Sequence, residues 1–204
     1  RIAQVGYAPD SKRALFAPTS DLRYTVEHAD KYIRQMQDKG RKVCLSIEGG
    51  NSGLGFCNLS DAQIADFVAQ VKACLETYDL DGVNLFDRNA GYGAVEGMPD
   101  MNTTSYPKLI MAMREAMPDK LLTLADYEEP TEYFWDTEAT GGIEVGKYLD
   151  YAWSGYMSED EDVQILDPWN RIDQSEGEMN GMMFPVNNHP RKPIAGLEQS
   201  KYGA

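Results

Sequence analysis

The sequence is short of basic residues, and this shortage excludes two classes of partner. Its 19 lysines and arginines stand against 33 aspartates and glutamates, which gives a formal net charge of -14 at pH 7. Such a charge repels phosphate backbones and anionic lipid surfaces, and no basic stripe along the chain opposes that repulsion locally. We therefore expect no nucleic-acid partner and no binding to membrane surfaces.

Cysteines and long apolar runs are also scarce. The three cysteines, Cys44, Cys57 and Cys74, have neither the spacing of a metal site nor the number of a disulfide framework. We expect Cys44 and Cys74 to be buried apolar groups, and we expect no metal and no cofactor. No apolar run approaches the roughly 20 residues of a membrane span. With 204 residues, of which 42% are hydrophobic, the chain is predicted to form one soluble domain over residues 1–204.

Short apolar runs alternate with amphipathic segments along the chain, which is typical of βα units around a parallel sheet. Strands are predicted at residues 2–7, 42–47, 82–86, 121–127 and 151–156, with weaker candidates at 182–186 and 193–197. Helices are predicted over residues 22–39, over residues 60–78 and around the apolar positions of 109–117. Ser60 and Gln63 form a capping box at the start of the second helix. The acidic run at 159–162 is expected to be a solvated loop.

This alternation fits either an open doubly wound sheet or a (β/α)8 barrel. The glycine-rich loop at 49–55 lacks the G-x-G-x-x-G spacing of dinucleotide-binding loops, which disfavours the first. We therefore predict an α/β fold of the TIM-barrel type. Because a complete barrel takes about 250 residues, we expect the barrel to be incomplete in this chain. A C-terminal strand and helix are expected to be missing, and the run at 14–18 is very short for a second strand.

The most informative stretch reads Asp79-Leu80-Asp81-Gly82-Val83-Asn84-Leu85-Phe86-Asp87-Arg88 and continues through a loop that contains Tyr92. Alternate residues of a strand share a face. Asn84, Phe86 and Arg88 are therefore predicted to point to the barrel interior and its mouth, and Asp87 to the opposite side.

This stretch resembles the Asp-x-x-Asp-x-Asp-x-Glu motif of glycoside hydrolase family 18, in the form found in its endo-β-N-acetylglucosaminidases. Residues 42–57 and 150–156 resemble the family's third and sixth strands, so the resemblance covers about residues 24–156. In the family, the final glutamate protonates the glycosidic oxygen and the preceding aspartate orients the substrate's N-acetyl group. Asp81 keeps the first aspartate, whereas Asn84, Phe86 and Arg88 replace the other three acids.

These replacements predict that the chemistry implied by the resemblance is lost. Arginine keeps its proton throughout the physiological range, and phenylalanine cannot polarise an acetamido group. The alternative is a relocated acid, for which Asp87, Asp126 and Glu128 are candidates, with Glu48 in a similar position. Against Asp87 stands its one-residue offset, which sends its side chain to the other face of the strand.

Several side chains are suited to holding a sugar at predicted strand ends and adjacent loops, namely Arg88, Tyr92, Asp126, Tyr127, Trp153 and Tyr156. Arg88 offers a fork of donors to glycan hydroxyls or to an acidic sugar. Alternatively, it forms a structural salt bridge with Asp81 or Asp126. Trp153 and Tyr156 could equally pack inside the barrel, and Trp135 and Trp169 are expected to pack. We expect His28 and His189 to face solvent.

Three functions follow from these residues. The first is a pseudo-hydrolase that binds N-acetylglucosamine-containing oligosaccharides, such as N-glycans, without cleaving them. The second is an active endo-β-N-acetylglucosaminidase or chitinase-like hydrolase with a relocated acid, and the third is a purely structural or inhibitor-like barrel. The resemblance implies a bacterial protein at an extracellular, cell-surface or periplasmic location. The oligomeric state stays open.

Overall fold

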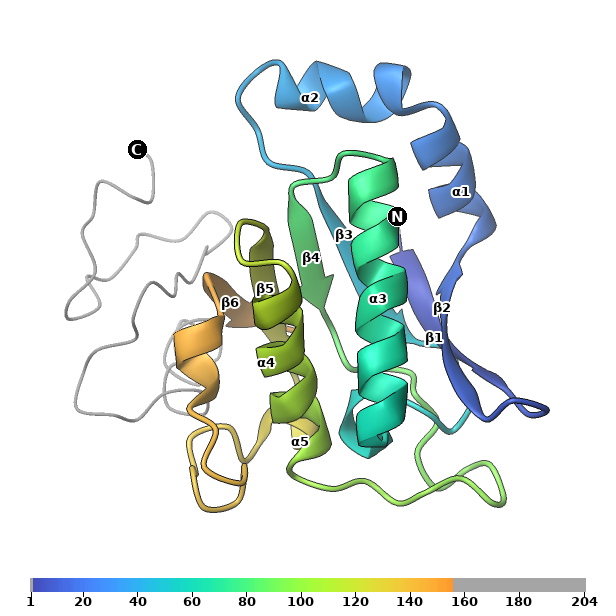
Figure 1. The fold of residues 1–204 in the computed structure, drawn as a ribbon, viewed down its shortest axis with the longest axis vertical. Helices are drawn as coiled ribbons and strands as arrows, with labels where there is room; N and C mark the ends of the chain where they lie inside the picture. Colours follow the sequence, from blue (N-terminus) through green and yellow to red (C-terminus); the bar gives the residue numbers. More distant parts are fainter. Residues whose placement is uncertain (1, 156–204) are drawn as a thin grey trace.

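Six strands form one sheet in the structure, which is a computed structural model that describes residues 2–155 apart from the side chains of residues 153 and 154. The strands are β1 (Ile2–Ala8), β2 (Arg13–Pro18), β3 (Cys44–Gly49), β4 (Gly82–Leu85), β5 (Leu121–Asp126) and β6 (Tyr151–Ser154). They lie in the order β2-β1-β3-β4-β5-β6, and every neighbouring pair is parallel except β1 and β2 (Figure 1). Parallel strands that follow one another in sequence order form the wall of a barrel, as predicted.

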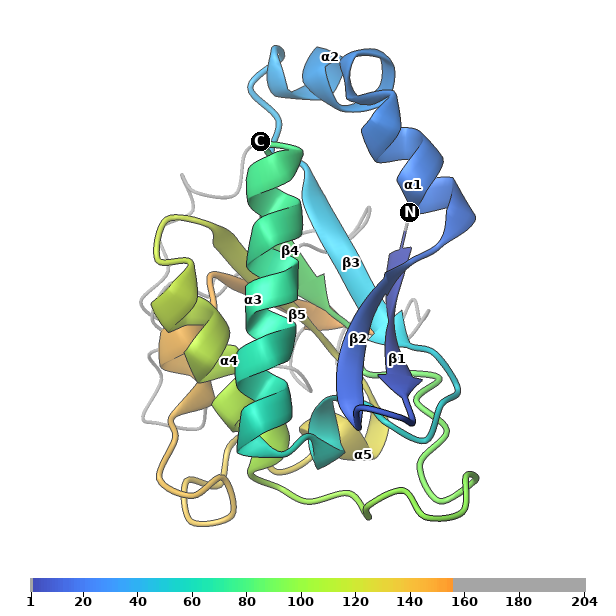
Figure 2. The same cartoon turned by 45° about the vertical axis from the view of Figure 1, so that its right-hand side comes forward.

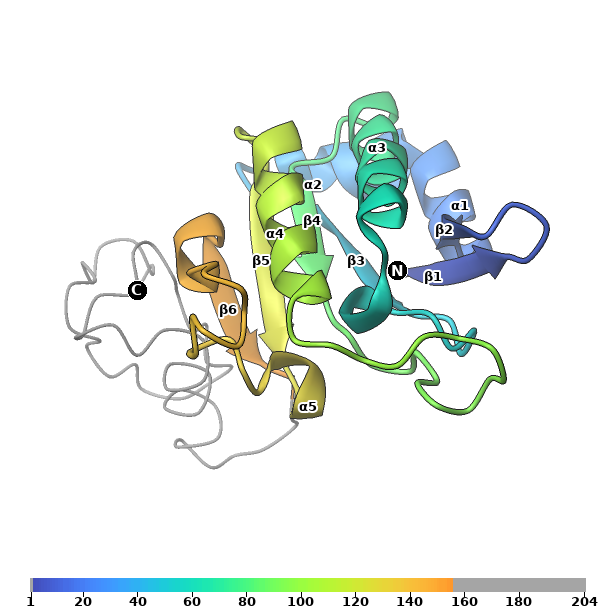
Figure 3. The same cartoon turned by 60° about the horizontal axis from the view of Figure 1, so that its bottom comes forward.

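The helices connect these strands. They are α1 (Ser20–Glu27), α2 (Gln35–Gln37), α3 (Asp61–Thr77), α4 (Ser105–Ala116) and α5 (Glu128–Thr131), with a π-helical turn η1 (Asp30–Arg34) and the 3-10 turns η2 (Phe56–Asn58) and η3 (Val145–Tyr148). The two long helices α3 and α4 lie side by side over one face of the sheet (Figures 2 and 3). We call this face the helix side, and the opposite face the inner side.

Helix α3 begins and packs as its sequence predicts. Ser60 accepts a hydrogen bond from the backbone of Gln63, and the Gln63 side chain accepts one from the backbone of Ser60, so the capping box is present. Apolar residues spaced three or four apart then face the sheet, and Ile64, Phe67, Val68, Val71 and Leu75 are all buried. Each such side chain contributes roughly 1.5–3 kcal/mol of burial to the core.

The two faces of the sheet differ in chemistry. On the helix side the strands contribute fully buried apolar residues, among them Val5, Ile47, Leu85 and Leu124. On the inner side a row of polar residues crosses three neighbouring strands. Asn84 of β4 donates to the Ser46 hydroxyl of β3 at 3.3 Å and accepts from the Thr123 hydroxyl of β5 at 2.8 Å. The parallel register pairs Ser46 with Asn84 and Asn84 with Thr123, so the alternation of each strand aligns these side chains.

The N-terminal segment differs from the predicted βα unit. The short run expected to be a second barrel strand forms β2, which folds back on β1 as an antiparallel hairpin. Gln70 of α3 holds β2 to the helix layer, because its side chain accepts from the backbone of Phe16 and donates to the carbonyl of Ala14. The helix predicted over 22–39 is also interrupted, since α1 ends at Glu27 and a π-helical turn precedes α2.

Two burial predictions are wrong. The fully buried cysteine is Cys57, whereas Cys44 and Cys74 are partly buried, and all three are free thiols. Burial raises the pKa of both Cys44 and Cys74 to about 11. Trp135, which was expected to pack, is 45% exposed.

Some predictions lie outside the described residues. They concern Tyr156, Trp169, His189, the acidic run at 159–162 and the strands at 182–186 and 193–197, together with the side chain of Trp153. Within residues 2–155, no helix combines the length and the apolar character that a membrane crossing requires.

Tyr106 gives a test of the core packing. Its side chain is fully buried on α4, and its hydroxyl has no hydrogen-bond partner among the described residues. Because an unsatisfied buried hydroxyl destabilises the folded state, Tyr106→Phe is expected to raise the free energy of unfolding by about 1 kcal/mol. Urea denaturation at neutral pH measures the change. Tyr133→Phe, which alters a 40% exposed tyrosine, is the control and should change nothing. A Tyr106→Phe protein less stable than the wild type would contradict the prediction.

Candidate functional site

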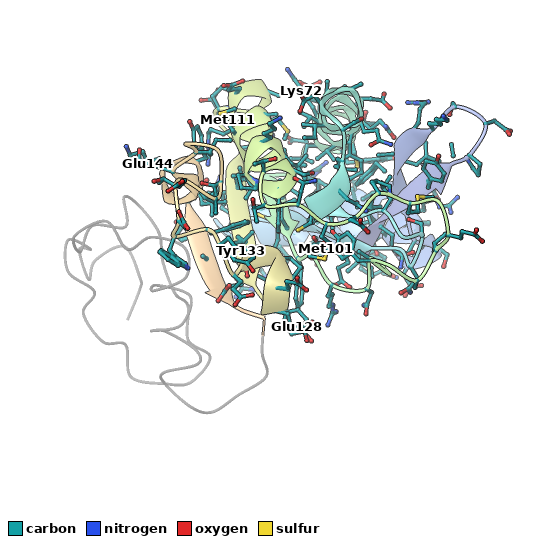
Figure 4. The ribbon with its side chains drawn as sticks, turned by 90° about the horizontal axis from the view of Figure 1, so that it is seen from below. Lys72, Met101, Met111, Glu128, Tyr133 and Glu144 are labelled. Atoms are coloured by element: carbon teal, nitrogen blue, oxygen red, sulfur yellow. The ribbon has the colours of Figure 1, made fainter. Side chains whose placement is uncertain are left out.

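The carboxyl ends of the parallel strands meet at one edge of the sheet, where the loops after β3 and β4 and helix α5 are also found. Figure 4 looks onto this edge, with Lys72 and Met111 on the helix side. Barrel enzymes carry their ligand-binding residues at this edge because loops from several strands converge there. We call this edge the mouth.

The loop after β4 crosses closely over the end of β3. The backbone N–H of Gly49 donates to the carbonyl of Arg88 at 2.8 Å, and that of Asn51 donates to the carbonyl of Asn89 at 2.7 Å. A side chain at Gly49 would lie 2.3 Å from the backbone nitrogen of Ala90, so only glycine permits this approach. The crossing brings Arg88 next to the last residues of β3.

Arg88 forms a two-bond salt bridge with Glu48. Its Nε donates to Oε2 and its Nη2 donates to Oε1 of Glu48, both at 2.9 Å. The carboxylate side chain is 6% exposed, whereas the arginine side chain is 44% exposed. The hydrogen bonds to Glu48 raise the pKa of Arg88 above its ordinary value, so Arg88 is a permanent cation. The predicted salt bridge of Arg88 therefore exists, but the predicted partners, Asp81 and Asp126, are wrong.

Two aromatic rings continue this arrangement across the mouth. The guanidinium of Arg88 lies over the ring of Phe86, 4.4 Å from its centroid. The ring of Phe86 meets that of Tyr127 edge-on, with centroids 5.4 Å apart. A side chain at Gly155 would lie 2.9 Å from Phe86 and 2.8 Å from Tyr127, so β6 approaches the two rings closely. We call Glu48, Phe86, Arg88 and Tyr127 the mouth cluster.

The mouth cluster combines fixed donors with aromatic surface. Glu48 uses the Nε–H of Arg88 and one N–H of its Nη2, which leaves Nη1 and the second N–H of Nη2 to bond oxygens of a ligand. The stacking on Phe86 and the fork to Glu48 hold the guanidinium in place, so little side-chain entropy is lost when a ligand binds. The cluster can hold hydroxyl or carbonyl oxygens beside an aromatic face. Its guanidinium cannot deliver a proton, because an arginine keeps its own.

Asp81, the retained aspartate of the motif, lies at the other end of β4. Its carboxylate accepts hydrogen bonds from the side chain of Gln37, the backbone of Val43 and the ammonium of Lys42. Partial burial alone would raise the pKa of Asp81, but these hydrogen bonds outweigh it and leave the pKa below its ordinary value. Asp81 thus ties β3 and β4 together at the edge opposite the mouth.

Asp87 points to the helix side, as the alternation of β4 predicts. The hydroxyl of Tyr92 donates to Asp87 Oδ2 at 2.6 Å, and the thiol of Cys57 donates to the same oxygen at 3.3 Å. Burial raises the pKa of Asp87 to about 6, although both hydrogen bonds act to lower it. Burial also raises the pKa of the Cys57 thiol well above its ordinary value. These three residues, which we call the Asp87 cluster, form a buried polar group separate from the mouth cluster.

The remaining candidates divide between the two sides of the sheet. Tyr92 belongs to the Asp87 cluster, because its hydroxyl also accepts from the backbone of Cys57 at 2.9 Å. Asp126 is 1% exposed and accepts a hydrogen bond from the hydroxyl of Thr131, which places it on the helix side beside α5. Glu128 is exposed, has a φ of 52° and lies away from the helix side in Figure 4.

The structure therefore brings together Arg88 and Tyr127 of the predicted ligand-binding residues, and it separates them from Tyr92 and Asp126. The pairing of Glu48 with Arg88 was missed. The alternation of β3 carried the signal, because Ser46 and Glu48 share the face that Asn84 occupies on the neighbouring parallel strand.

Comparisons with known proteins agree on one family. Residues 9–170 match the family model described as glycosyl hydrolases family 18. The chain is 36% identical over 191 residues to an endo-beta-N-acetylglucosaminidase of Flavobacterium sp. (strain SK1022), covering 93% of this chain and 57% of that protein. It is 29% identical over 156 residues to endo-beta-N-acetylglucosaminidase F1 of Elizabethkingia meningoseptica, covering 76% of this chain and 45% of that protein. The chain thus spans about half the length of these relatives.

Solved structures support the fold. EndoBT-3987 of Bacteroides thetaiotamicron, crystallised with a Man9GlcNAc2Asn substrate, matches with a TM-score of 0.66 at 22% identity, over 76% of this chain and 38% of that chain. The second catalytic domain of a group II chitinase from Ostrinia furnacalis matches with a TM-score of 0.51 at 20% identity, over 74% of this chain and 40% of that chain. These neighbours confirm the predicted barrel class.

Proposed function

Because this chain belongs to family 18 of the glycosyl hydrolases, we propose that it is a glycan-binding member that holds N-acetylglucosamine-containing oligosaccharides, such as N-glycans, without cleaving them. The observation that carries the proposal is the position of Arg88. It stands where the resemblance places the proton-donating glutamate, and Glu48 and Phe86 fix it there.

Loss of hydrolysis follows from the chemistry of these side chains. General acid catalysis contributes about 10²–10⁴-fold to the rate, and an arginine cannot supply it. Glu48 is a poor substitute because both of its oxygens accept hydrogen bonds from Arg88. Asp87 and Asp126 are 3% and 1% exposed and lie on the helix side, so they face away from Arg88 and Tyr127. The rival hypothesis of a relocated acid therefore depends on Glu128.

The ligand class is supported by the relatives and by the mouth cluster. The two curated relatives are endo-beta-N-acetylglucosaminidases, and the EndoBT-3987 structure contains an N-glycan. Sugars bind to proteins through hydroxyl groups and through their apolar ring faces, and Arg88 with Phe86 and Tyr127 offers partners for both. We further propose that the protein acts outside the cytoplasm, as the resemblance implies.

The test is a calorimetric titration of the chain with a high-mannose N-glycan, followed by mass spectrometry of a high-mannose glycoprotein incubated with the chain. We expect saturable binding and no loss of glycan mass. Arg88→Lys keeps the charge but loses the two-bond fork, so it should weaken binding by about tenfold. Asp100→Asn, which changes an exposed residue, is the control.

Two outcomes would count against the proposal. No binding at millimolar glycan would favour the purely structural barrel. Release of the glycan would favour an active enzyme, and loss of that release in Glu128→Gln would identify the relocated acid.

A further inference from the structure

One of the two edges of Arg88 that can hold a carboxylate is already occupied. Two parallel N–H groups of a guanidinium match the two oxygens of a carboxylate, and Glu48 takes one such pair, Nε and Nη2, at 2.9 Å each. An acidic sugar at the mouth cluster would have to bind at the other edge, formed by Nη1 and the second N–H of Nη2, beside the Glu48 carboxylate that already neutralises the guanidinium. The arginine is thus less available to acids than an unpaired arginine would be.

The charge of Glu48 adds a second obstacle to acids. Its side chain is 6% exposed, so water and salt screen it weakly. A ligand carboxylate near Nη1 would lie within several ångströms of the Glu48 carboxylate, and two like charges at that separation repel each other. The net charge of -14 on the chain adds to the repulsion.

We propose that Glu48 makes the mouth cluster selective for neutral oligosaccharides and excludes sugars that carry a carboxylate, an inference that rests on the glycan-binding function proposed above. Neutral sugars present hydroxyl and acetamido oxygens, which accept a hydrogen bond from Nη1 without repulsion. In this arrangement Arg88 contacts the sugar. Glu48 does not contact the sugar; its negative charge offsets the positive charge of Arg88 at the binding surface.

The chain contains a matched control at a distance from the mouth. Arg13 of β2 holds Asp66 of α3 through Nε and Nη2, at 2.8 and 2.9 Å, on the outer surface. Asp66→Asn therefore removes one negative charge from an arginine fork, as Glu48→Gln does, but outside the mouth. Comparison of the two variants separates the local charge of the mouth from the net charge of the protein.

The experiment titrates wild type, Glu48→Gln and Asp66→Asn with two probes, N-acetylchitotriose, which is neutral, and a hyaluronan tetrasaccharide, which carries glucuronate carboxylates beside N-acetylglucosamine. We expect the wild type to bind the acidic probe at least about tenfold more weakly than the neutral one. Glu48→Gln also loosens the guanidinium, which weakens binding of both probes, so the expected result is a rise of about tenfold in the affinity for the acidic probe relative to that for the neutral probe. Asp66→Asn should leave the ratio of the two affinities unchanged.

Each outcome bears on the inference. Equal binding of both probes by the wild type, or an unchanged ratio in Glu48→Gln, would overturn the selectivity while leaving glycan binding intact. Binding of neither probe by the wild type would overturn the selectivity, and the absence of binding to the high-mannose N-glycan as well would overturn glycan binding itself. If Glu48→Gln fails to fold, the salt dependence of binding by the wild type still tests the inference. Because salt screens the net charge of the protein but screens the buried Glu48 charge only weakly, the wild type should still bind the neutral probe more tightly at about 1 M salt, and equal affinities there would contradict the inference.

Discussion

The free energy of unfolding is expected to fall by about 2 to 4 kcal/mol between about pH 4 and pH 7 through Asp87 alone, at about 1.4 kcal/mol for each pKa unit. Burial raises the pKa of Asp87 from its ordinary 3.8 to about 6 in the folded state. Between these values the folded protein keeps a proton that the unfolded chain has released. A rise in pH through this window therefore favours unfolding, and above it both states are ionised and the effect is constant.

Asp87→Asn is the variant that isolates this effect, because asparagine fills the same space and carries no charge at any of these pH values. Other carboxylates titrate in the same range. Hydrogen bonds from Arg13 lower the pKa of Asp66, so its contribution is present above about pH 4 and is lost below it, opposite in sign to that of Asp87. The informative quantity is consequently the difference in unfolding free energy between wild type and variant, measured by urea denaturation at several pH values.

As the pH rises from about 4 to 7, the unfolding free energy of Asp87→Asn should increase relative to that of the wild type by about 2 to 4 kcal/mol. The control is Asp100→Asn, at an exposed position, for which the difference from wild type should stay flat. If the Asp87→Asn and wild-type profiles run parallel throughout, Asp87 does not hold its proton in the folded protein.

The regular elements of this fold were predictable because their signals are local. The capping box at Ser60 and the apolar spacing of α3 both act within a few residues, so the sequence alone marks where that helix begins and which face it buries. The same holds for the alternation of β4, which predicted opposite directions for Asp87 and Arg88. The hairpin of β1 and β2 was missed although its signal is also local: only residues 9–12 separate the two strands, and parallel pairing needs a much longer connection.

The site was predictable only in part, for a related reason. The strand alternation identified Arg88 as a mouth residue, but its partner is 40 residues away and belongs to another strand. The loop after β4 crosses β3 at Gly49 and brings Arg88 next to Glu48. No local sequence pattern predicts that crossing. The alternation of β5 places Asp126 on the side of Leu124, whereas no strand pattern predicts the direction of Tyr92, because it lies in the loop after β4.

Removal of Arg88 is expected to destabilise the protein far more than removal of its partner, because the two side chains differ in exposure. Arg88→Met leaves the Glu48 carboxylate, 6% exposed, without a counter-charge. Breaking a buried ion pair in this way costs 3–5 kcal/mol, and because the arginine side is open to water we expect about 2 kcal/mol here. Glu48→Gln leaves a cation that is 44% exposed and can be hydrated, so it should cost less than about 1 kcal/mol.

The double variant Arg88→Met with Glu48→Gln completes the cycle. Since it removes both charges, it should recover most of the stability that Arg88→Met loses, and the interaction energy between the two sites should be about 1 to 2 kcal/mol. Urea denaturation of the four proteins at one pH and ionic strength measures it. Equal losses in the two single variants, with a double variant that shows their sum, would mean that the pair contributes nothing and that Arg88 is held by Phe86 alone. In that case Glu48 would not fix the guanidinium in place. The position of the Arg88 side chain at the mouth would then depend on its stacking on Phe86 and not on the ion pair.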